Sequence, residues 1–175
     1  MGSRQIALSG VFSALAVVFL MLGGVIPGAT FCAPVLAMAA LLPVLEECGP
    51  RAAGGAWLAG AILALILDPD REAAMVYLCF GWYPLLRPRI ARVPSRLLRL
   101  AAKLAVCNCA GALLYGFLLR LMGLPEALES ASGWLAAVTL VTANITFLLV
   151  DLALGRLTLL WHHRLRRRFF RGRRQ

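Results

Sequence analysis

The stretch IALSGVFSALAVVFLMLGGVI, residues 6–26, decides the fold because it contains no charged residue over the length of a membrane-crossing helix. A helix needs about 20 residues to cross the hydrocarbon core of a bilayer, with a range of roughly 17–25. Further uncharged runs follow at 52–67, 104–119 and 134–150, and 61% of the sequence is hydrophobic. That content exceeds the usual value for soluble domains. These runs predict an all-α integral membrane protein.

Shorter apolar segments lie between the long runs and raise the predicted number of spans to six. Short or broken helices are tolerated in a bilayer when longer neighbours shelter them. Pro34, Pro43 and Pro84 are expected to kink or end the shorter helices. In chain order, the predicted spans are residues 6–27, 29–45, 52–67, 73–86, 101–123 and 134–154.

Basic residues gather between and after the spans, in a pattern that predicts topology. Lys and Arg near the ends of spans are retained on the cytoplasmic side. If both termini are cytoplasmic, nearly all basic residues fall on the inner side. One group of five arginines fills a single connection and seven more fill the tail. The inner set comprises Arg4, Arg51, Arg87, Arg89, Arg92, Arg96, Arg99, Lys103, Arg156, Arg164, Arg166, Arg167, Arg168, Arg171, Arg173 and Arg174.

The outer connections are acidic instead. They contain a single arginine, Arg71, together with Asp68, Asp70, Glu72, Glu126 and Glu129. If the second and third predicted spans were a single span, the basic and the acidic connections would no longer lie on opposite sides of the membrane. The sequence therefore predicts a bundle of six transmembrane helices in the bacterial cell (inner) membrane, with the N- and C-termini in the cytoplasm.

The last residues predict a separate basic tail. We divide the chain into a membrane domain, 1–156, and a cytoplasmic tail, 157–175. The tail mixes arginines with Trp161, Phe169 and Phe170, as interfacial amphipathic helices do. Each basic residue beside an anionic leaflet contributes about 1 kcal/mol. We expect the tail to contact anionic lipid of the inner leaflet and expect no nucleic acid partner; RNA binding and docking of a cytoplasmic protein are the less favoured alternatives.

One acidic motif raises the question of catalysis. Glu46-Glu47-Cys48-Gly49-Pro50-Arg51 fits E-E-x-x-x-R and resembles the first motif of the CAAX-type intramembrane proteases. Those enzymes need a continuous helix and further histidines, whereas Gly49-Pro50 breaks the helix and the histidines, His162 and His163, lie in the tail. We therefore expect no enzymatic activity. Cys107-x-Cys109 lacks a second ligand pair, so neither a metal site nor a cofactor is expected.

Polar residues inside the predicted spans are few. A carboxylate at a helix centre costs roughly 2.5–3.5 kcal/mol by insertion scales, so such groups usually have partners. For Asp151 we expect an ion pair with Lys103 or Arg156 at the inner interface. Asn108 and Asn144 lie near the middle of their spans, where a hydrogen bond between helices and ligand binding are equally good explanations.

Small residues predict close helix packing at two places. Ala52, Ala56, Gly60 and Ala64 recur every four residues and form one stripe in the third span. The first span carries two small-xxx-small pairs, Ser9/Ser13 and Gly10/Ala14. Such stripes serve packing inside a bundle or contact with a partner protein.

Six short spans, a small-residue face at the start of the first span, few titratable residues and a length near 175 together resemble the S components of energy-coupling factor transporters. In that family the coupling helix carries A-x-x-x-A, and Gly10-x-x-x-Ala14 stands at the matching place here with Ser9 and Ser13 beside it. The resemblance implies capture of a vitamin-like small molecule or metal ion. It also implies partners, namely a transmembrane coupling protein and cytoplasmic ATPases.

The same resemblance implies that ligand contacts come from the outer halves of the spans. Arg120 would meet an anionic group and Tyr115 would stack on the ligand; alternatively, Arg120 extends outward to the interface and Glu72 caps a helix. The expected ligand-binding residues are Glu72, Tyr115, Arg120, Thr139, Thr142 and Asn144.

A second function comes from another class of protein. The chain is similar in size to the rod-shape-determining membrane protein of bacterial wall synthesis, which is a non-transporting scaffold. Spans poor in polar residues and an arginine-rich inner face favour this alternative.

Overall fold

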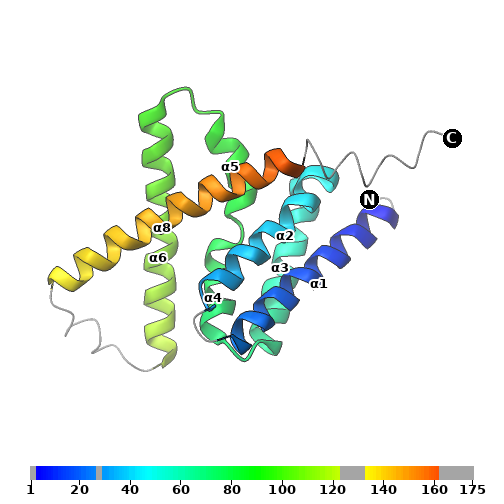
Figure 1. The fold of residues 1–175 in the computed structure, drawn as a ribbon, viewed down its shortest axis with the longest axis horizontal. Coiled ribbons are helices and arrows are strands. Elements are labelled where there is room, and N and C mark those ends of the chain that lie inside the picture. Colours follow the sequence, from blue (N-terminus) through cyan, green and yellow to red (C-terminus); the bar gives the residue numbers. More distant parts are fainter. Residues whose placement is uncertain (1–2, 27–28, 123–132, 162–175) are drawn as a thin grey trace.

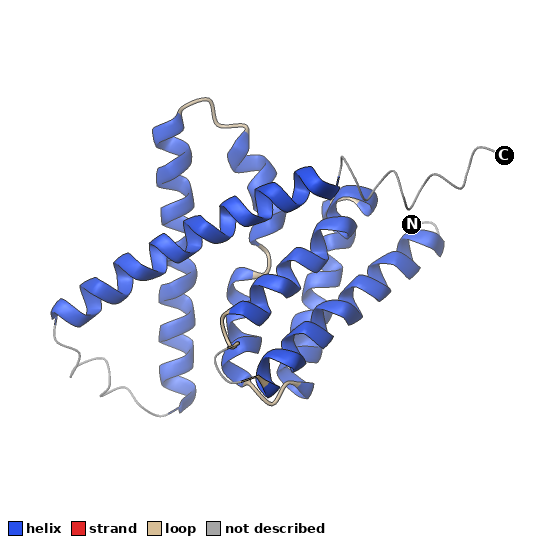
Figure 2. Ribbon diagram, viewed as in Figure 1, coloured by secondary structure: helices blue, strands red, loops and turns tan. Residues whose placement is uncertain are grey.

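In a computed structural model, which describes residues 3–26, 29–122 and 133–161, the chain is almost entirely helical and its turns are short (Figure 2). The helices are arranged as shown in Figure 1. In chain order they are α1 (Ser3–Val25), α2 (Cys32–Cys48), α3 (Pro50–Leu67), α4 (Arg71–Phe80), α5 (Tyr83–Ala91), α6 (Arg96–Met122) and α8 (Gly133–Leu160).

Four of the described helices are long and apolar enough to cross a membrane. These segments are Gln5–Val25 of α1, Pro50–Leu67 of α3, Arg96–Gly116 of α6 and Gly133–Leu160 of α8. Helix α2 has 17 residues, which is the lower limit for a span. The prediction of a helical membrane protein is therefore confirmed.

The predicted fourth span, 73–86, is two helices rather than one. Helix α4 ends at Phe80, and α5 begins at Tyr83 with Pro84 in its first turn. Proline is favoured there because the first turn does not use its missing N–H. At the break, a Cβ on Gly81 would lie 2.7 Å from the Trp57 ring of α3. A glycine therefore lets α3 and α4 approach closely.

The expected break between the second and third spans is confirmed. Gly49 has a φ of 85°, which favours glycine, and Pro50 begins α3. Pro43 does not end its helix, because α2 continues to Cys48. The Glu46-Glu47 pair thus lies at the end of α2, and Arg51 is in the first turn of α3.

Most of the core lies among α1, α2, α3 and α4, and buried residues of α5, α6 and α8 extend it. The predicted stripe of α3, made of Ala52, Ala56, Gly60 and Ala64, is buried as a whole. Ser13 of α1 is also buried and donates a hydrogen bond from Oγ to the carbonyl oxygen of Ala56, at 3.0 Å. Small side chains bring these backbones close enough for that bond. The stripe therefore serves internal packing.

Helices α6 and α8 lie beside this bundle and cross one another obliquely (Figure 1). Their membrane-length segments are only 11% and 12% buried, compared with 28% in α1 and 33% in α3. Most of their apolar surface therefore faces outward. Helix α8 continues to Leu160, past the predicted domain boundary at 156, and the Trp161 ring packs edge-on against Phe12 of α1 at 6.3 Å. Residues 162–175 of the predicted tail lie outside the described residues.

Replacing Gly60 with leucine is expected to lower the free energy of unfolding by about 1–3 kcal/mol. A Cβ at Gly60 would already lie 3.4 Å from the Tyr77 hydroxyl oxygen and 3.5 Å from Oγ of Ser13, so a larger side chain must separate the helices. Reversible unfolding in mixed detergent micelles measures the loss. Gly55→Leu on the same helix is the control, because nothing lies within 4 Å of its Cβ position. Equal losses in both variants would contradict this account of the packing.

Candidate functional site

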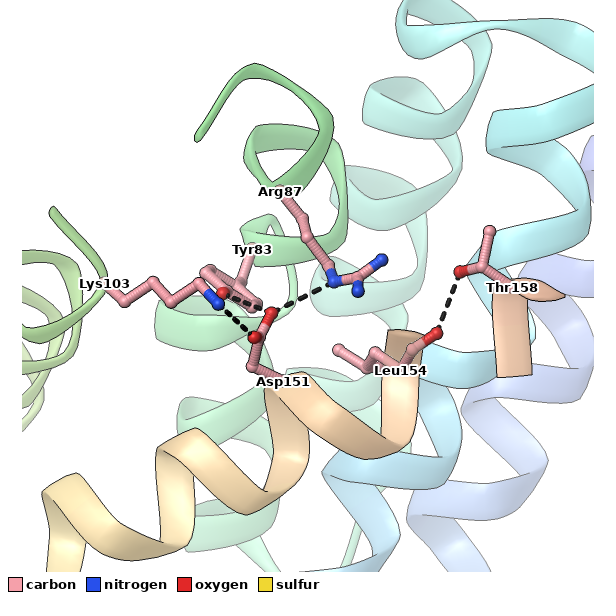
Figure 3. Close-up of polar contacts among 6 residues, drawn as sticks. All are labelled: Tyr83, Arg87, Lys103, Asp151, Leu154 and Thr158. Atoms are coloured by element: carbon pink, nitrogen blue, oxygen red, sulfur yellow. Dashed lines mark hydrogen bonds and ion pairs between the residues drawn. The ribbon is translucent and has the colours of Figure 1, made fainter. Parts of the chain in front are cut away.

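A buried carboxylate on α8 connects three helices. Asp151 accepts hydrogen bonds at Oδ1 from the Tyr83 hydroxyl, at 2.7 Å, and from Nε of Arg87, at 3.0 Å. Nζ of Lys103 donates to Oδ2. Figure 3 shows the three donors converging on Asp151 from α5 and α6. We call these four residues the Asp151 cluster.

The local sequence accounts for this convergence. Tyr83 and Arg87 are four residues apart on α5, so both side chains lie on one helix face. The break before α5 sets the position of that face, and Lys103 comes from the first half of α6. Phe147 lies one turn before Asp151, and its ring meets the Tyr83 ring at a centroid distance of 4.6 Å in an edge-to-face arrangement. The contact with Phe147 therefore helps to hold the Tyr83 ring next to the Asp151 carboxylate.

A glycine leaves room for the arginine. Gly155 lies one turn after Asp151, and a Cβ there would be 2.3 Å from an Nη atom of Arg87. Any larger residue would displace the guanidinium group. The pattern Asp151-x-x-x-Gly155 thus supplies both the charge and the space that Arg87 needs.

The predicted ion pair of Asp151 with Lys103 or Arg156 is confirmed for Lys103. Lys103 forms an ion pair with it, whereas Arg156 forms none within the described residues. The sequence does not predict the contacts of Tyr83 and Arg87 with Asp151, because an arginine in a basic connection indicates topology first. The four-residue spacing of Tyr83 and Arg87 on one helix face was the available signal.

A cavity of about 440 Å³ opens beside the cluster. Its lining contains three basic residues, one acid, and uncharged residues of α8. The lining residues are Arg87, Lys103, Asp151, Leu152, Gly155, Arg156, Thr158 and Leu159. The cavity is therefore positively charged, with apolar side chains at its edge.

The predicted ligand-binding residues whose side chains are described do not line this cavity. Tyr115 of α6 is 51% exposed. Thr139 and Thr142 are exposed on α8, and each hydroxyl donates to the carbonyl four residues earlier in its own helix, at 2.9 Å. Nδ2 of Asn144 donates to Oδ1 of Asn108 at 3.1 Å, which realises the predicted bond between helices. The side chain of Arg120 lies outside the described residues.

Glu72, the remaining predicted ligand residue, is exposed in the first turn of α4. It does not cap the helix. Asp70 is the N-cap, and its carboxylate accepts bonds from the backbone N–H groups of Glu72 and Ala73. Asp68 is buried beside it and accepts from the backbone N–H of Asp70 at 3.0 Å. Burial raises the pKa of Asp68 above its usual value because it disfavours the charged form.

The predicted coupling residues divide between two faces of α1. Ser13 faces the bundle and is buried, and the Ser9 hydroxyl bonds to its own helix at Gln5. Gly10 and Ala14 are exposed, and nothing lies within 4 Å of a Cβ built on Gly10. The two small-xxx-small pairs therefore have different surroundings.

The apolar helices and the buried ion cluster define the class, a helical membrane protein. No protein-family model, curated protein or solved structure matches the chain.

Asp151→Asn is expected to lower the free energy of unfolding by about 2–4 kcal/mol, because it leaves two cations facing each other without their carboxylate. Lys103→Gln should cost less, since Arg87 and Tyr83 still bind Asp151. Reversible unfolding in mixed micelles gives both values. A Lys103→Gln loss as large as that of Asp151→Asn would contradict the central place of the carboxylate.

Gly155→Ala is expected to move the guanidinium group of Arg87 away from Asp151. Arginine ends can shift, so the fold should persist with a loss of about 1 kcal/mol in unfolding free energy. Gly111→Ala is the control because nothing lies within 4 Å of its Cβ position, and it should be neutral or stabilising. In an Arg87→Ala background, Gly155→Ala should no longer be costly. A cost that is the same with and without Arg87 would refute the contact.

Proposed function

We propose that the protein is the substrate-capturing membrane subunit of an energy-coupling factor type transporter, for a vitamin-like small molecule or metal ion. The observation that carries the proposal is the exposed Gly10/Ala14 face at the start of α1. In a membrane, small residues on an outward face let another helix approach closely. The energy would come from the partner's ATPases.

The surroundings of α1 support a partner on that face. Ser13, on the other face of α1, is already used within the bundle because it bonds to α3. The outward side continues from Gly10 and Ala14 to Val18, which is 48% exposed, and Val25, which is 74% exposed. A partner helix aligned with α1 could therefore follow one continuous apolar strip.

The proposed topology has six crossings, with α4 and α5 together forming one broken crossing. Both termini would be in the cytoplasm of a bacterial cell. In Figure 1 the start of α1, the α2–α3 turn and the end of α8 lie toward one end of the molecule, and the α3–α4 turn lies toward the other. That arrangement agrees with the charge segregation, because Arg51 follows the α2–α3 turn and Asp68 precedes α4.

A second candidate is a non-transporting scaffold of the rod-shape-determining type. It is favoured by the arrangement of α6 and α8, in which Thr139 and Thr142 are exposed and bonded to their own helix. A scaffold needs outward surfaces and no enclosed site. A CAAX-type protease is the remote third possibility.

Co-purification separates the candidates. The tagged chain is recovered from its own membranes under mild detergent, and native mass spectrometry identifies bound proteins and small molecules. Recovery of ATPase subunits or of a ligand supports the transporter subunit. Recovery of wall-synthesis or cytoskeletal proteins without a ligand would sink it.

Gly10→Leu and Ala14→Leu are expected to reduce recovery of the coupling partner about tenfold, because a bulky side chain prevents close helix approach. Both positions are exposed, so folding and any bound ligand should be retained. Gly116→Leu on α6 is the matched control, since it is also exposed with nothing within 4 Å of its Cβ position. Unchanged recovery in both α1 variants would show that partners dock elsewhere.

A further inference from the structure

The lining of the cavity beside the Asp151 cluster carries more positive charges than negative ones. Arg87, Lys103 and Arg156 line it, and Asp151 is the one acid among its lining residues. Within the described residues, Arg156 forms no ion pair. The cavity lining therefore has a net charge of about +2 at neutral pH.

Arg87 keeps the edge of its guanidinium group that carries both Nη atoms without a hydrogen bond among the described residues. It uses only Nε toward Asp151, and Figure 3 shows both Nη atoms directed away from the carboxylate, toward the α8 turn that contains Leu154 and Thr158. Arginine presents its paired N–H groups as a planar fork that matches two oxygens of one anion. Gly155 leaves room for the guanidinium group itself, because a Cβ there would lie 2.3 Å from an Nη atom.

We propose that this cavity binds a phosphate group. A phosphate offers several oxygens in a tetrahedral arrangement, so it can accept bonds from the free fork of Arg87 while it lies close to Lys103 and Arg156. Leu152 and Leu159 are 62% and 60% exposed at the edge of the cavity, where apolar chains can cover them. The phosphate belongs either to an anionic lipid headgroup or to free phosphate in solution, and this binding requires no transport activity.

Native mass spectrometry of the full-length protein tests the proposal. The protein in mild detergent is titrated with phosphatidylglycerol in one arm and with inorganic phosphate in the other, and bound adducts are counted at each concentration. The Arg156→Gln variant removes one cavity cation from an exposed position that forms no ion pair within the described residues. We expect it to weaken the first binding event about fivefold.

Arg92→Gln is the matched control. Arg92 is exposed at the end of α5, and its substitution removes the same charge outside the cavity. Its first binding event should match that of the unmodified protein. An equal weakening in both variants, or no saturable adduct in either arm, would overturn the proposal.

The two arms identify the source of the phosphate. Saturable phosphatidylglycerol binding that depends on Arg156, with no inorganic phosphate adduct, assigns the site to a lipid headgroup. The reverse pattern assigns it to free phosphate. Gly155→Ala supplies a second readout, because displacing the Arg87 fork should weaken the same event even though every cavity charge is kept.

Discussion

The carboxylate of Asp151 is the interaction on which one half of the structure depends. A charged group inside a membrane helix is costly unless it is paired and hydrogen-bonded. Asp151 meets this condition through Tyr83, Arg87 and Lys103, which belong to two other helices. Because the charge is costly without these partners, α5, α6 and α8 must meet at Asp151.

This constraint matters because few residues of the α6 and α8 segments are buried. Lipid is as apolar as leucine, so burial alone does not drive helices together in a bilayer. The α6 and α8 segments are mostly exposed, and besides the Asp151 cluster the Asn108–Asn144 hydrogen bond joins them. Helices α1 and α3 use another means, close contact through small residues such as Ser13 and Gly60.

The sequence predicted the helices better than it predicted the site. Apolar runs such as 6–26 mark spans because the bilayer fixes their length, and Gly49-Pro50 marks a break because of its backbone preferences. The Lys103–Asp151 pair could be predicted because a buried acid needs a cation. The spacing of Tyr83 and Arg87 places them on one helix face, but their distance from Asp151 along the chain does not indicate that they contact it. Nor could the sequence show that Thr139 bonds to its own helix.

The Asp151 cluster also links the position of α8 to the proposed binding of an anion in the cavity. The carboxylate fixes Arg87 through Nε, and Gly155 leaves room for the guanidinium group beside α8. An anion in the adjoining cavity would contact cations from α5, α6 and α8 at once. Whatever binds the assembled site but not the separated helices stabilises the assembly by mass action. The position of α8 and occupancy of the cavity must therefore influence each other.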